Sequence, residues 1–479
     1  MRAGTLAASI AAQLDAHRGQ SAVRLLPDGL DAFTLRMHSA RLAQTSLDVQ
    51  TYIWRDDETG RFIAHELILA ADRGVDVRVL LDDMDARPRD LALEALDAHP
   101  HISVRMFNPF RTRSGLLRTL AEVSQRGNRL NHRMHNKTWI VDRQAAIAGG
   151  RNLGNEYFSS ANDVNFIDLD VLMLGPAVDE ATREFERYWR CNLSVPIVRL
   201  RKYMHKKLMP KSFRSRLERS VRQNESSEHV RKLREQDALH ALLEGPFVWS
   251  ANVRLIADDP RKALGETDAL YSHVLDSVAR EIRAATRELL LISPYFIPGI
   301  GGTAALRSFA LQGGTVEILT NSLAATDVAI VHSGYAKYRK PLLEAGVRIF
   351  EMKSALTLED GGAPFRLGSS RASLHTKAAI IDAERVFVGS FNIDPRSAEL
   401  NCEMGVWIRS RQLAQEMTHS FRVGTDAQRS YAVSSEDGRI EWLEQTNGNV
   451  VRHDREPHAS WIRRTIVRIL EMLPIESQL

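Results

Sequence analysis

Two segments of this chain carry the same potentially reactive side chains at the same spacing. Both follow the pattern H-x-K-x4-D-x6-G-[GS]-x-N, so each offers an imidazole, an ammonium group and a carboxamide. A short motif often occurs by chance, but two copies with identical internal spacing do not. The first copy consists of His135, Lys137, Asp142, Gly149, Gly150 and Asn152, and the second of His375, Lys377, Asp382, Gly389, Ser390 and Asn392.

This set of groups suits substitution at the phosphorus of a phosphodiester. One histidine would attack phosphorus and form a covalent phosphohistidine. The other would protonate the leaving oxygen and then deprotonate the incoming alcohol or water. An ordinary imidazole pKa near 6.5 allows both roles around neutral pH. Lys137, Lys377, Asn152 and Asn392 would stabilise the negative charge on the phosphorane oxygens. The chemistry needs no metal and no cofactor, and we expect none.

The residues around each motif predict a strand, a tight turn and a returning strand. Apolar runs at 138–141 and 145–148 flank Asp142, and runs at 378–381 and 386–388 flank Asp382. Side chains two apart on a strand share a face, so the histidine and lysine of each copy point the same way. We interpret Asp142 and Asp382 as turn-forming residues that lie away from that face.

The small residues at the end of each motif have a separate expected role. Gly149, Gly150, Gly389 and Ser390 stand where the returning strand comes back beside the histidine and lysine. Residues with little or no side chain let a backbone approach a ligand closely. We therefore expect these four residues to have a structural role in each motif, which lets the backbone come close to a ligand.

Each imidazole also needs a carboxylate to orient it. Candidates follow each motif, in the stretches 168–170 and 401–403. Aligning Val171 with Met404 makes Asp170 and Glu403 equivalent and places Asp168 opposite an asparagine. This alignment favours Asp170 over Asp168 as the functional acid of the first half.

The repeat extends well beyond the motifs. Segment 47–53 parallels 290–296, and 74–81 parallels 313–320, each offset by roughly 240 residues. Strands alternate with amphipathic stretches such as 60–73 and 304–312, which indicates α/β lobes with buried mixed sheets. We expect an N-terminal lobe at 1–195, a basic amphipathic linker at 196–245 and a C-terminal lobe at 246–479.

Composition agrees with a globular chain of two or more domains. Of 479 residues, 44% are hydrophobic and 26% charged, and the only two cysteines, Cys191 and Cys402, form no disulfide or metal pattern. The apolar runs fall short of the ~18–20 residues of a membrane span, and the first residues do not read as a signal peptide. We expect a cytoplasmic location, peripheral on the inner membrane.

Both motifs resemble those of the HKD phospholipase D superfamily, and the similarity extends over nearly the whole chain. The chain is more similar still to bacterial cardiolipin synthases of the phospholipase D type, above all the C type. The segments that carry this narrower resemblance are 47–54, 134–155, 320–340 and 373–403.

The resemblance implies two lobes related by a pseudo-two-fold axis, with the active site between them. It implies that His135 is the nucleophile and His375 the acid/base. It also implies crossed pairing, in which Glu403 orients His135 and Asp170 orients His375. The implied reaction moves a phosphatidyl group from a donor phospholipid, thought to be phosphatidylethanolamine, onto phosphatidylglycerol to give cardiolipin. The residues themselves leave open which histidine attacks, which lipid is the donor and whether a helper protein takes part.

Three segments could contact an anionic membrane surface. The stretch 199–222 holds ten lysines and arginines and one acid, with Phe213, Leu217 and Val221 on one helical face. The C-terminal helix places Trp461, Ile462 and other apolar residues beside arginines. A third candidate is the loop 111–126. The alternatives are a solvated linker helix, a C-terminal helix packed on its own lobe, and nucleic-acid binding.

Three other functions share parts of this pattern. A phospholipase D hydrolase would use the same residues, with water as the acceptor. A phosphodiesterase acting on nucleic acid is disfavoured, because aliphatic stripes rather than stacking aromatic residues accompany the basic run. We therefore expect no nucleic-acid partner. A non-catalytic lipid-binding scaffold would not require two intact motifs.

Overall fold

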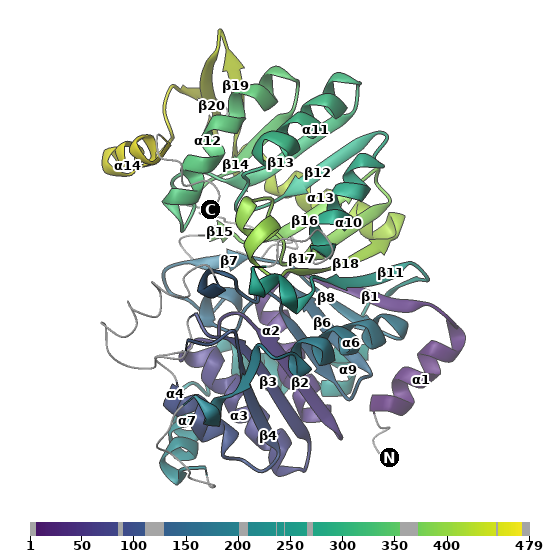
Figure 1. The fold of residues 1–479 in the computed structure, drawn as a ribbon. Coiled ribbons are helices and arrows are strands. Elements are labelled where there is room, and N and C mark those ends of the chain that lie inside the picture. The colour runs from purple at the N-terminus through teal and green to yellow at the C-terminus, as the bar shows by residue number, and fades with distance from the viewer. Residues whose placement is uncertain are drawn as a thin grey trace.

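The chain folds into two α/β lobes that lie one above the other in Figure 1. The structure is a computed structural model and describes residues 6–84, 90–110, 129–200, 209–235, 237–243, 245–265, 272–354, 372–446 and 449–471. Each lobe is built on one large mixed sheet, which confirms the predicted fold class.

The sheet of the first lobe has nine strands in the order β10-β1-β8-β6-β5-β2-β3-β4-β9. Strands β2, β3 and β4 are parallel, and the other neighbours are antiparallel. The strands are β1 (Ser21–Leu26), β2 (Ser46–Thr51), β3 (Asp76–Asp82), β4 (Ile102–Phe107), β5 (Thr138–Val141), β6 (Ala145–Gly149), β8 (Asp170–Leu174), β9 (Ser194–Pro196) and β10 (Val248–Ser250).

The sheet of the second lobe repeats this arrangement. Its order is β11-β18-β17-β16-β12-β13-β14-β19-β20-β21, so the series from β11 to β14 matches the series from β1 to β4 strand for strand. The strands are β11 (Val253–Ala257), β12 (Glu288–Ile292), β13 (Thr315–Asn321), β14 (Arg348–Met352), β16 (Lys377–Ile381), β17 (Arg385–Gly389), β18 (Met404–Arg409), β19 (Ser430–Glu436), β20 (Arg439–Thr446) and β21 (Asn449–His453). Both motifs form the predicted hairpins, β5–β6 and β16–β17.

Helices cover both sheets, and the predicted stretches 60–73 and 304–312 are α3 and α11. In α3 the carboxylate of Asp57 accepts from the amide of Gly60, which satisfies one of the donors at the helix start. The helices of the first lobe are α1 (Leu6–Ala16), α2 (Gly29–Leu42), α3 (Glu58–Asp72), α4 (Asp90–Asp97) and α6 (Pro176–Arg190). Those of the second are α10 (His273–Arg283), α11 (Gly299–Leu311), α12 (Ala329–Glu344) and α13 (Arg411–Gly424).

The predicted linker forms α7 (Lys211–Gln223), α8 (Glu228–Glu235) and α9 (Ala238–Leu243). Strand β10 follows these helices and pairs with β1, so they belong to the first lobe, and the predicted start of the second lobe at 246 is too early. Phe213 and Leu217 of α7 are buried in the same core cluster as the first lobe's own apolar residues. The interpretation of this apolar face as membrane-binding is therefore wrong, because the face is turned inward. Residues 201–208 of the basic stretch, and the loop 111–126, lie outside the described residues.

The second lobe ends in an extension made of β19, β20, β21 and α14 (Trp461–Glu471). Helix α14 packs against α12 and stands at the edge of the molecule (Figure 1). Within the part of the chain that the structure describes, no helix has both the length and the apolarity of a membrane span.

The two lobes are joined by backbone pairing and by a shared core. Strand β7 (Asn165–Ile167) of the first lobe runs parallel to β15 (Ala372–Leu374) of the second. One hydrophobic cluster contains Val171 and Met173 of β8 together with Val388 and Val406 of the second lobe. This junction lies directly beside both motif histidines.

Candidate active site

His135 of the first lobe is held by groups of the second lobe. Its Nδ1 lies 2.9 Å from Oε2 of Glu403 and 3.1 Å from the carbonyl oxygen of Ser390. Its backbone amide donates to the carbonyl of Cys402 at 2.8 Å. Because Nδ1 donates its proton to these oxygens, Nε2 carries the lone pair that can attack an electrophile. The expected pairing of Glu403 with His135 is confirmed.

His375 of the second lobe is held in the same way by the first lobe. Its Nδ1 lies 2.5 Å from Oδ2 of Asp168, and its backbone amide donates to the carbonyl of Ile167 at 2.8 Å. The prediction that Asp170 orients His375 is therefore wrong. The carboxylate of Asp170 instead accepts from the guanidinium of Arg36 at 2.9 Å, and Arg151 lies 3.4 Å away.

Strand register explains why the sequence alignment failed. In the first lobe Gly149 pairs with Asp170, whereas in the second lobe Gly389 pairs with Gly405. Asp168 is therefore the true counterpart of Glu403, and the alignment was displaced by two residues. A shift of two keeps every side chain on the same face of a strand, so the apolar pattern could not reveal it.

The small residues of the motifs make room for these carboxylates. A Cβ on Gly150 would lie 2.1 Å from Oδ1 of Asp168, and one on Gly149 would lie 2.3 Å from Oδ1 of Asp170. A Cβ on Gly389 would lie 2.3 Å from the carbonyl oxygen of Met404 on the neighbouring strand. The glycines thus serve close packing between strands, which agrees with the structural role expected of them in the motif.

Ser390 occupies the position that corresponds to Gly150. Its hydroxyl donates to Oε2 of Glu403 and so fixes the carboxylate that holds His135. The longer glutamate of the second lobe is therefore positioned by an additional hydrogen bond.

The two motif lysines are buried close to the histidines. Lys137 donates to the carbonyl of His135 at 2.5 Å, and Lys377 donates to the carbonyl of His375 and lies 2.9 Å from Nδ1 of the same residue. Both side chains are nearly inaccessible to solvent. A buried ammonium group is costly unless an anion pairs with it, so these two lysines are suited to hold an anion.

The motif asparagines differ in their surroundings. The carboxamide of Asn152 donates to the hydroxyl of Tyr157 at 2.9 Å and accepts from the amide of Ile53 at 3.1 Å. Oδ1 of Asn392 is buried and has no hydrogen-bond partner among the described residues. The carboxamide of Asn152 thus forms its hydrogen bonds within the first lobe, whereas that of Asn392 has a buried acceptor without a partner among the described residues.

Asp142 and Asp382 lie in the hairpin turns, as predicted. Both have positive φ, 51° and 55°. Asp142 accepts from the amides of Thr45 and Ser46, and Asp382 accepts from that of Arg287, at the start of the neighbouring strand. These carboxylates pin each hairpin to its sheet.

Burial and neighbouring charge determine the protonation of the site. Burial lowers the pKa of His135 to about 4, that of Lys137 to about 7 and that of Lys377 to about 8. Burial and the charge of Lys377 also lower the pKa of His375. Although burial alone would raise them, attraction to the facing histidine lowers the pKa of Glu403 and that of Asp168. Each pair is therefore a neutral imidazole that donates to an ionised carboxylate.

Two tyrosines that the sequence interpretation missed contact the histidines. The ring of Tyr52 stands edge-on to His135 at 5.1 Å between centroids, and that of Tyr157 stands edge-on to His375 at 5.3 Å. Tyr52 falls in the repeated segment 47–53, which was the available signal. Tyr157 has no counterpart in the repeat, so only the fold reveals it.

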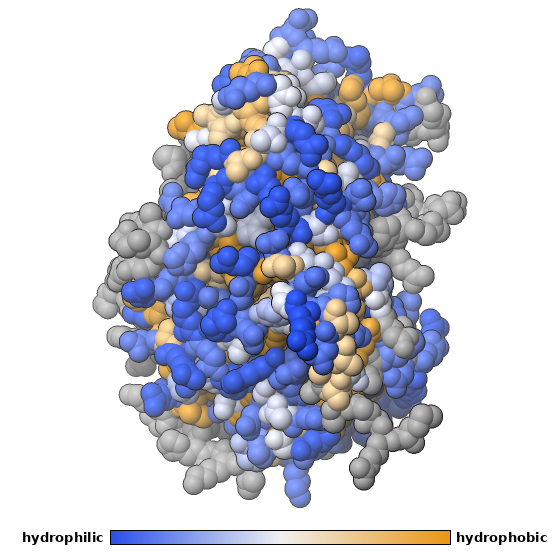
Figure 2. Space-filling model, turned by 90° about the vertical axis from the view of Figure 1, so that its right-hand side faces the viewer, coloured by the Kyte–Doolittle hydropathy of each residue, from blue (hydrophilic) through white to orange (hydrophobic). Residues whose placement is uncertain are grey.

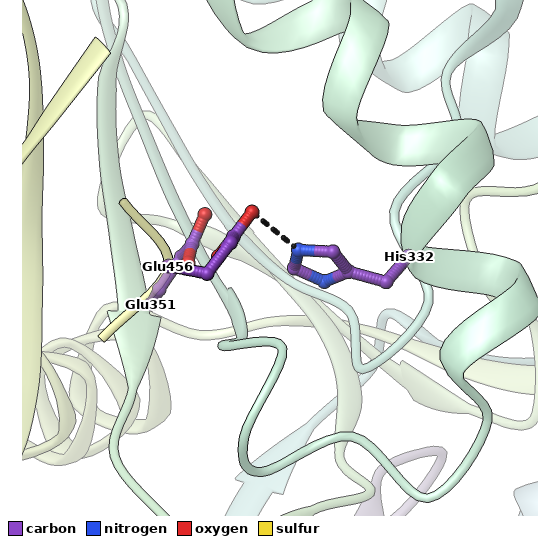
Figure 3. Close-up of side chains that lie close together, drawn as sticks. All are labelled: His332, Glu351 and Glu456. Carbon is purple, nitrogen blue, oxygen red and sulfur yellow. Dashed lines mark hydrogen bonds and ion pairs between the residues drawn. The ribbon is translucent and has the colours of Figure 1, made fainter. Parts of the chain in front are cut away.

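A second cluster of titratable groups lies away from this site, in the second lobe (Figure 3). His332, Glu351 and Glu456 offer ligand atoms close enough for a metal ion, and His332 lies 3.1 Å from Glu456. However, the guanidinium of Arg339 reaches both carboxylates, at 3.0 Å and 2.6 Å. Its charge lowers the pKa of Glu456 to about 2 against the opposing effect of burial. The protein thus supplies its own cation here, which ties the C-terminal extension to α12.

Comparisons with known proteins agree with this geometry. Residues 37–189 and 278–423, one segment in each lobe, match the model of the family described as "Cardiolipin synthase, PLD-like domain". The chain is 39% identical to Cardiolipin synthase C of Escherichia coli (strain K12), over 98% of this chain and 99% of that protein. It is 25% identical to Major cardiolipin synthase ClsA of Bacillus subtilis (strain 168), over 88% of this chain and 73% of that protein.

Among solved structures, the phosphatidylserine synthase of Haemophilus influenzae Rd KW20 has the same fold. The TM-score is 0.62 at 14% identity, and the match covers 95% of both chains. This match shows the fold, and the sequence comparisons show the family. The chain belongs to the phospholipase D-like cardiolipin synthase family.

Proposed function

We propose that this protein synthesises cardiolipin by transferring a phosphatidyl group from a donor phospholipid to phosphatidylglycerol. The observation that carries the proposal is the pair of crossed histidine–carboxylate contacts, His135 with Glu403 and His375 with Asp168. Two oriented imidazoles beside two buried ammonium groups suit a double displacement at a phosphodiester. The similarity to Cardiolipin synthase C supports cardiolipin as the product.

In the first step Nε2 of His135 attacks phosphorus. A P–N bond forms, the P–O bond to the donor's head-group alcohol breaks, and His375 gives its Nε2 proton to the leaving oxygen. His135 suits the nucleophile because its lowered pKa keeps it neutral. His375 suits the acid because the negative charge of a bound phosphate offsets the positive charge of Lys377 that disfavours its protonation.

In the second step a glycerol hydroxyl of phosphatidylglycerol attacks the phosphohistidine. A new P–O bond forms, the P–N bond breaks, and His375 takes the hydroxyl proton, which restores both histidines. Lys137 and Lys377 stabilise the charge on the phosphorus oxygens in both steps. Following the resemblance to the C type, we propose phosphatidylethanolamine as the donor, so that ethanolamine leaves first.

Helix α14 is the surface that we propose to contact the lipid bilayer. Trp461, Ile462 and Ile469 are 70%, 52% and 52% exposed, whereas Val467 is buried against the second lobe. Arg463 donates to the carbonyls of Ala324 and Thr326, in the loop that precedes α12. Figure 2 shows the side of the molecule opposite to α14. That side is hydrophilic over most of its area, and its apolar residues lie in separate patches.

The same loop borders the reaction centre. Its Asp327 accepts from the hydroxyl of Tyr295 at 2.8 Å, and its charge acts on Lys377. Binding of α14 at the cytoplasmic face of the inner membrane would therefore bring the site toward its lipids. The substitution Trp461→Ser should reduce sedimentation with vesicles that contain phosphatidylglycerol, and unchanged sedimentation would count against this surface.

The covalent intermediate provides the direct test of the mechanism. Rapid quenching with a labelled donor lipid, followed by peptide mapping, should place the adduct on His135. An adduct on His375 would reverse the two roles, and saturable turnover without any adduct would contradict the mechanism.

The nearest alternative is a phospholipase D, in which water replaces phosphatidylglycerol as the acceptor. Mixed vesicles of phosphatidylethanolamine and phosphatidylglycerol separate the two activities. Cardiolipin as the main product supports the proposal. Phosphatidic acid without cardiolipin would establish the hydrolase instead.

A further inference from the structure

The carboxylate of Asp327 stands at the same edge of the second sheet as His375. Strands β12 and β13 are parallel neighbours, and β16 is antiparallel to β12, with Ile292 opposite Ala378. The carboxyl ends of β12 and β13 therefore meet the start of β16, which His375 precedes by two residues. Tyr295 follows β12, and Asp327 follows β13. Loops at the carboxyl ends of parallel strands are where α/β proteins commonly bind their ligands.

Contacts and charge connect Asp327 to the reaction centre. The hydroxyl of Tyr295 donates to its two carboxylate oxygens, which lie 2.8 Å and 2.9 Å away. Tyr295 interacts electrostatically with Tyr157, whose ring stands edge-on to His375 at 5.3 Å. Burial lowers the pKa of Lys377 to about 8, and Asp327 is one of four carboxylates whose charge opposes this shift. Asp327 thus lies on the side of the site that holds the proposed acid, His375.

The carboxylate of Asp327 is accessible and has no cation paired with it. The residue is exposed, and no lysine, arginine or histidine within the described part of the chain forms an ion pair with it. Arg463 of α14 lies within reach of its charge, but the guanidinium donates to carbonyl oxygens of the same loop. Asp394, another acid on this side, is buried, and its carboxylate accepts from the amide of Ser397 at 2.6 Å. An accessible carboxylate beside a site for an anionic phosphate is complementary to a ligand that also carries a positive charge.

We propose that Asp327, held by Tyr295, binds the ammonium group of the donor's head group and so selects an ethanolamine phospholipid over one with an uncharged head group. The inference rests on the proposed function for the reaction and deepens it by naming the residue that recognises the donor. In ethanolamine, two carbons separate the ammonium group from the oxygen that receives the proton of His375. With that oxygen at Nε2 of His375, the ammonium group falls in the part of the site where the carboxylate stands. Loss of this charge-assisted hydrogen bond should weaken recognition about tenfold.

The first test compares two donors whose head groups have the same shape. Phosphatidylethanolamine ends in an ammonium group and phosphatidylpropanol in a methyl group, and release of the labelled head-group alcohol gives kcat/KM for each. Asp327→Asn keeps an acceptor for Tyr295 but removes the charge. The ratio of kcat/KM for phosphatidylethanolamine over phosphatidylpropanol should therefore fall about tenfold. Tyr295→Phe should lower the ratio less, because the carboxylate stays and loses only its hydrogen bond.

The matched control is Asp454→Asn, which removes an 83% exposed carboxylate elsewhere in the second lobe. This variant should retain the wild-type ratio. An equal loss with both donors in Asp327→Asn, or no loss with either, would overturn the proposal. A raised KM for phosphatidylglycerol with an unchanged donor ratio would assign Asp327 to the acceptor and overturn it as well.

The second test measures binding and needs no turnover. Isothermal titration of the wild-type protein with O-phosphoethanolamine and with propyl phosphate should give a Kd about tenfold lower for O-phosphoethanolamine, and Asp327→Asn should bind the two alike. Equal Kd values for the wild-type protein would refute the ammonium site. A preference for O-phosphoethanolamine in a protein that forms no cardiolipin would reject the proposed function and keep the site. Cardiolipin formation without that preference would do the reverse.

Discussion

The two lobes share one sheet order but support their histidines differently. The first lobe contributes Asp168 to the site and leaves room for it with Gly150. The second contributes Glu403, one methylene longer, and holds it with the hydroxyl of Ser390. The duplicated core thus keeps the backbone contacts, while side-chain length and a single hydroxyl distinguish the two halves.

The difference extends to the charges around each ring. Nδ1 of His375 has Lys377 at 2.9 Å, whereas Nδ1 of His135 has a second acceptor, the carbonyl of Ser390. A second acceptor favours a proton on Nδ1 and a lone pair on Nε2. This difference between near-symmetric positions supports the proposal that His135 is the nucleophile.

The largest expected effect separates nucleophile from acid. His135→Ala should lower turnover about 10⁴-fold or more with any donor, because no P–N bond can form. His375→Ala should be equally severe with a natural lipid but far milder with a phosphatidyl-p-nitrophenol donor, whose leaving group needs no proton. Release of p-nitrophenol measures the rate of the first step. Equal losses of this rate in the two variants would contradict the different roles of the two histidines.

The next effect distinguishes Asp168 from Asp170. Asp168→Asn should lower kcat about 10³-fold or more while the fold remains intact, because His375 loses its orienting charge. Asp170→Asn should instead destabilise the protein by about 3–5 kcal/mol, since it leaves the buried guanidinium groups of Arg36 and Arg151 poorly paired. Kinetics and denaturant unfolding are measured on both variants. A loss of kcat in Asp170→Asn and a loss of stability in Asp168→Asn would instead support Asp170 as the functional acid.

Substitutions at the equivalent positions Gly150 and Ser390 should have smaller effects on kcat. Ser390→Ala removes a hydrogen bond to a buried carboxylate, which is worth about 1.5–3 kcal/mol, so kcat should fall about tenfold. Gly150→Ala should cost more, because its Cβ meets the Asp168 carboxylate at 2.1 Å. Steady-state kinetics decide the order, and a harmless Gly150→Ala would contradict the packing argument.

The pH profile provides the mildest test. His135 must be neutral, and its pKa of about 4 places the acid limb of kcat/KM near pH 4. His375 must be protonated, and its lowered pKa places the alkaline limb below about 6.5, with further loss as Lys137 and Lys377 deprotonate at about pH 7 and about 8. Activity should change about tenfold per pH unit on each limb. In the profile of kcat the alkaline limb should shift to higher pH, because bound phosphate favours the imidazolium form of His375. A profile that is flat from pH 4 to 9 would exclude these roles for the two histidines.

Much of this molecule could be predicted from its residues. The hairpins, α3, α11 and the turn carboxylates follow from local patterns that occur twice. The pairing of Glu403 with His135 follows from the resemblance to the phospholipase D superfamily. The pairing of Asp168 with His375 was not predicted, because β8 is buried along its whole length. A shift of the alignment by two residues therefore leaves the pattern of apolar residues unchanged. Burial of the apolar face of α7 against the first lobe was not predicted, because an amphipathic sequence has the same pattern whether its apolar face contacts lipid or protein. Both errors concern tertiary contacts between segments distant in the chain.

The exchange of carboxylates between lobes has a consequence for biosynthesis. The N-terminal lobe leaves the ribosome first, at a time when the glutamate for its histidine has not yet been translated. The nascent half therefore holds His135 without its carboxylate until Glu403 has been translated and the two lobes have joined at β7 and β15. We therefore expect a chain truncated before Glu403 to be inactive, because His135 would lack its carboxylate.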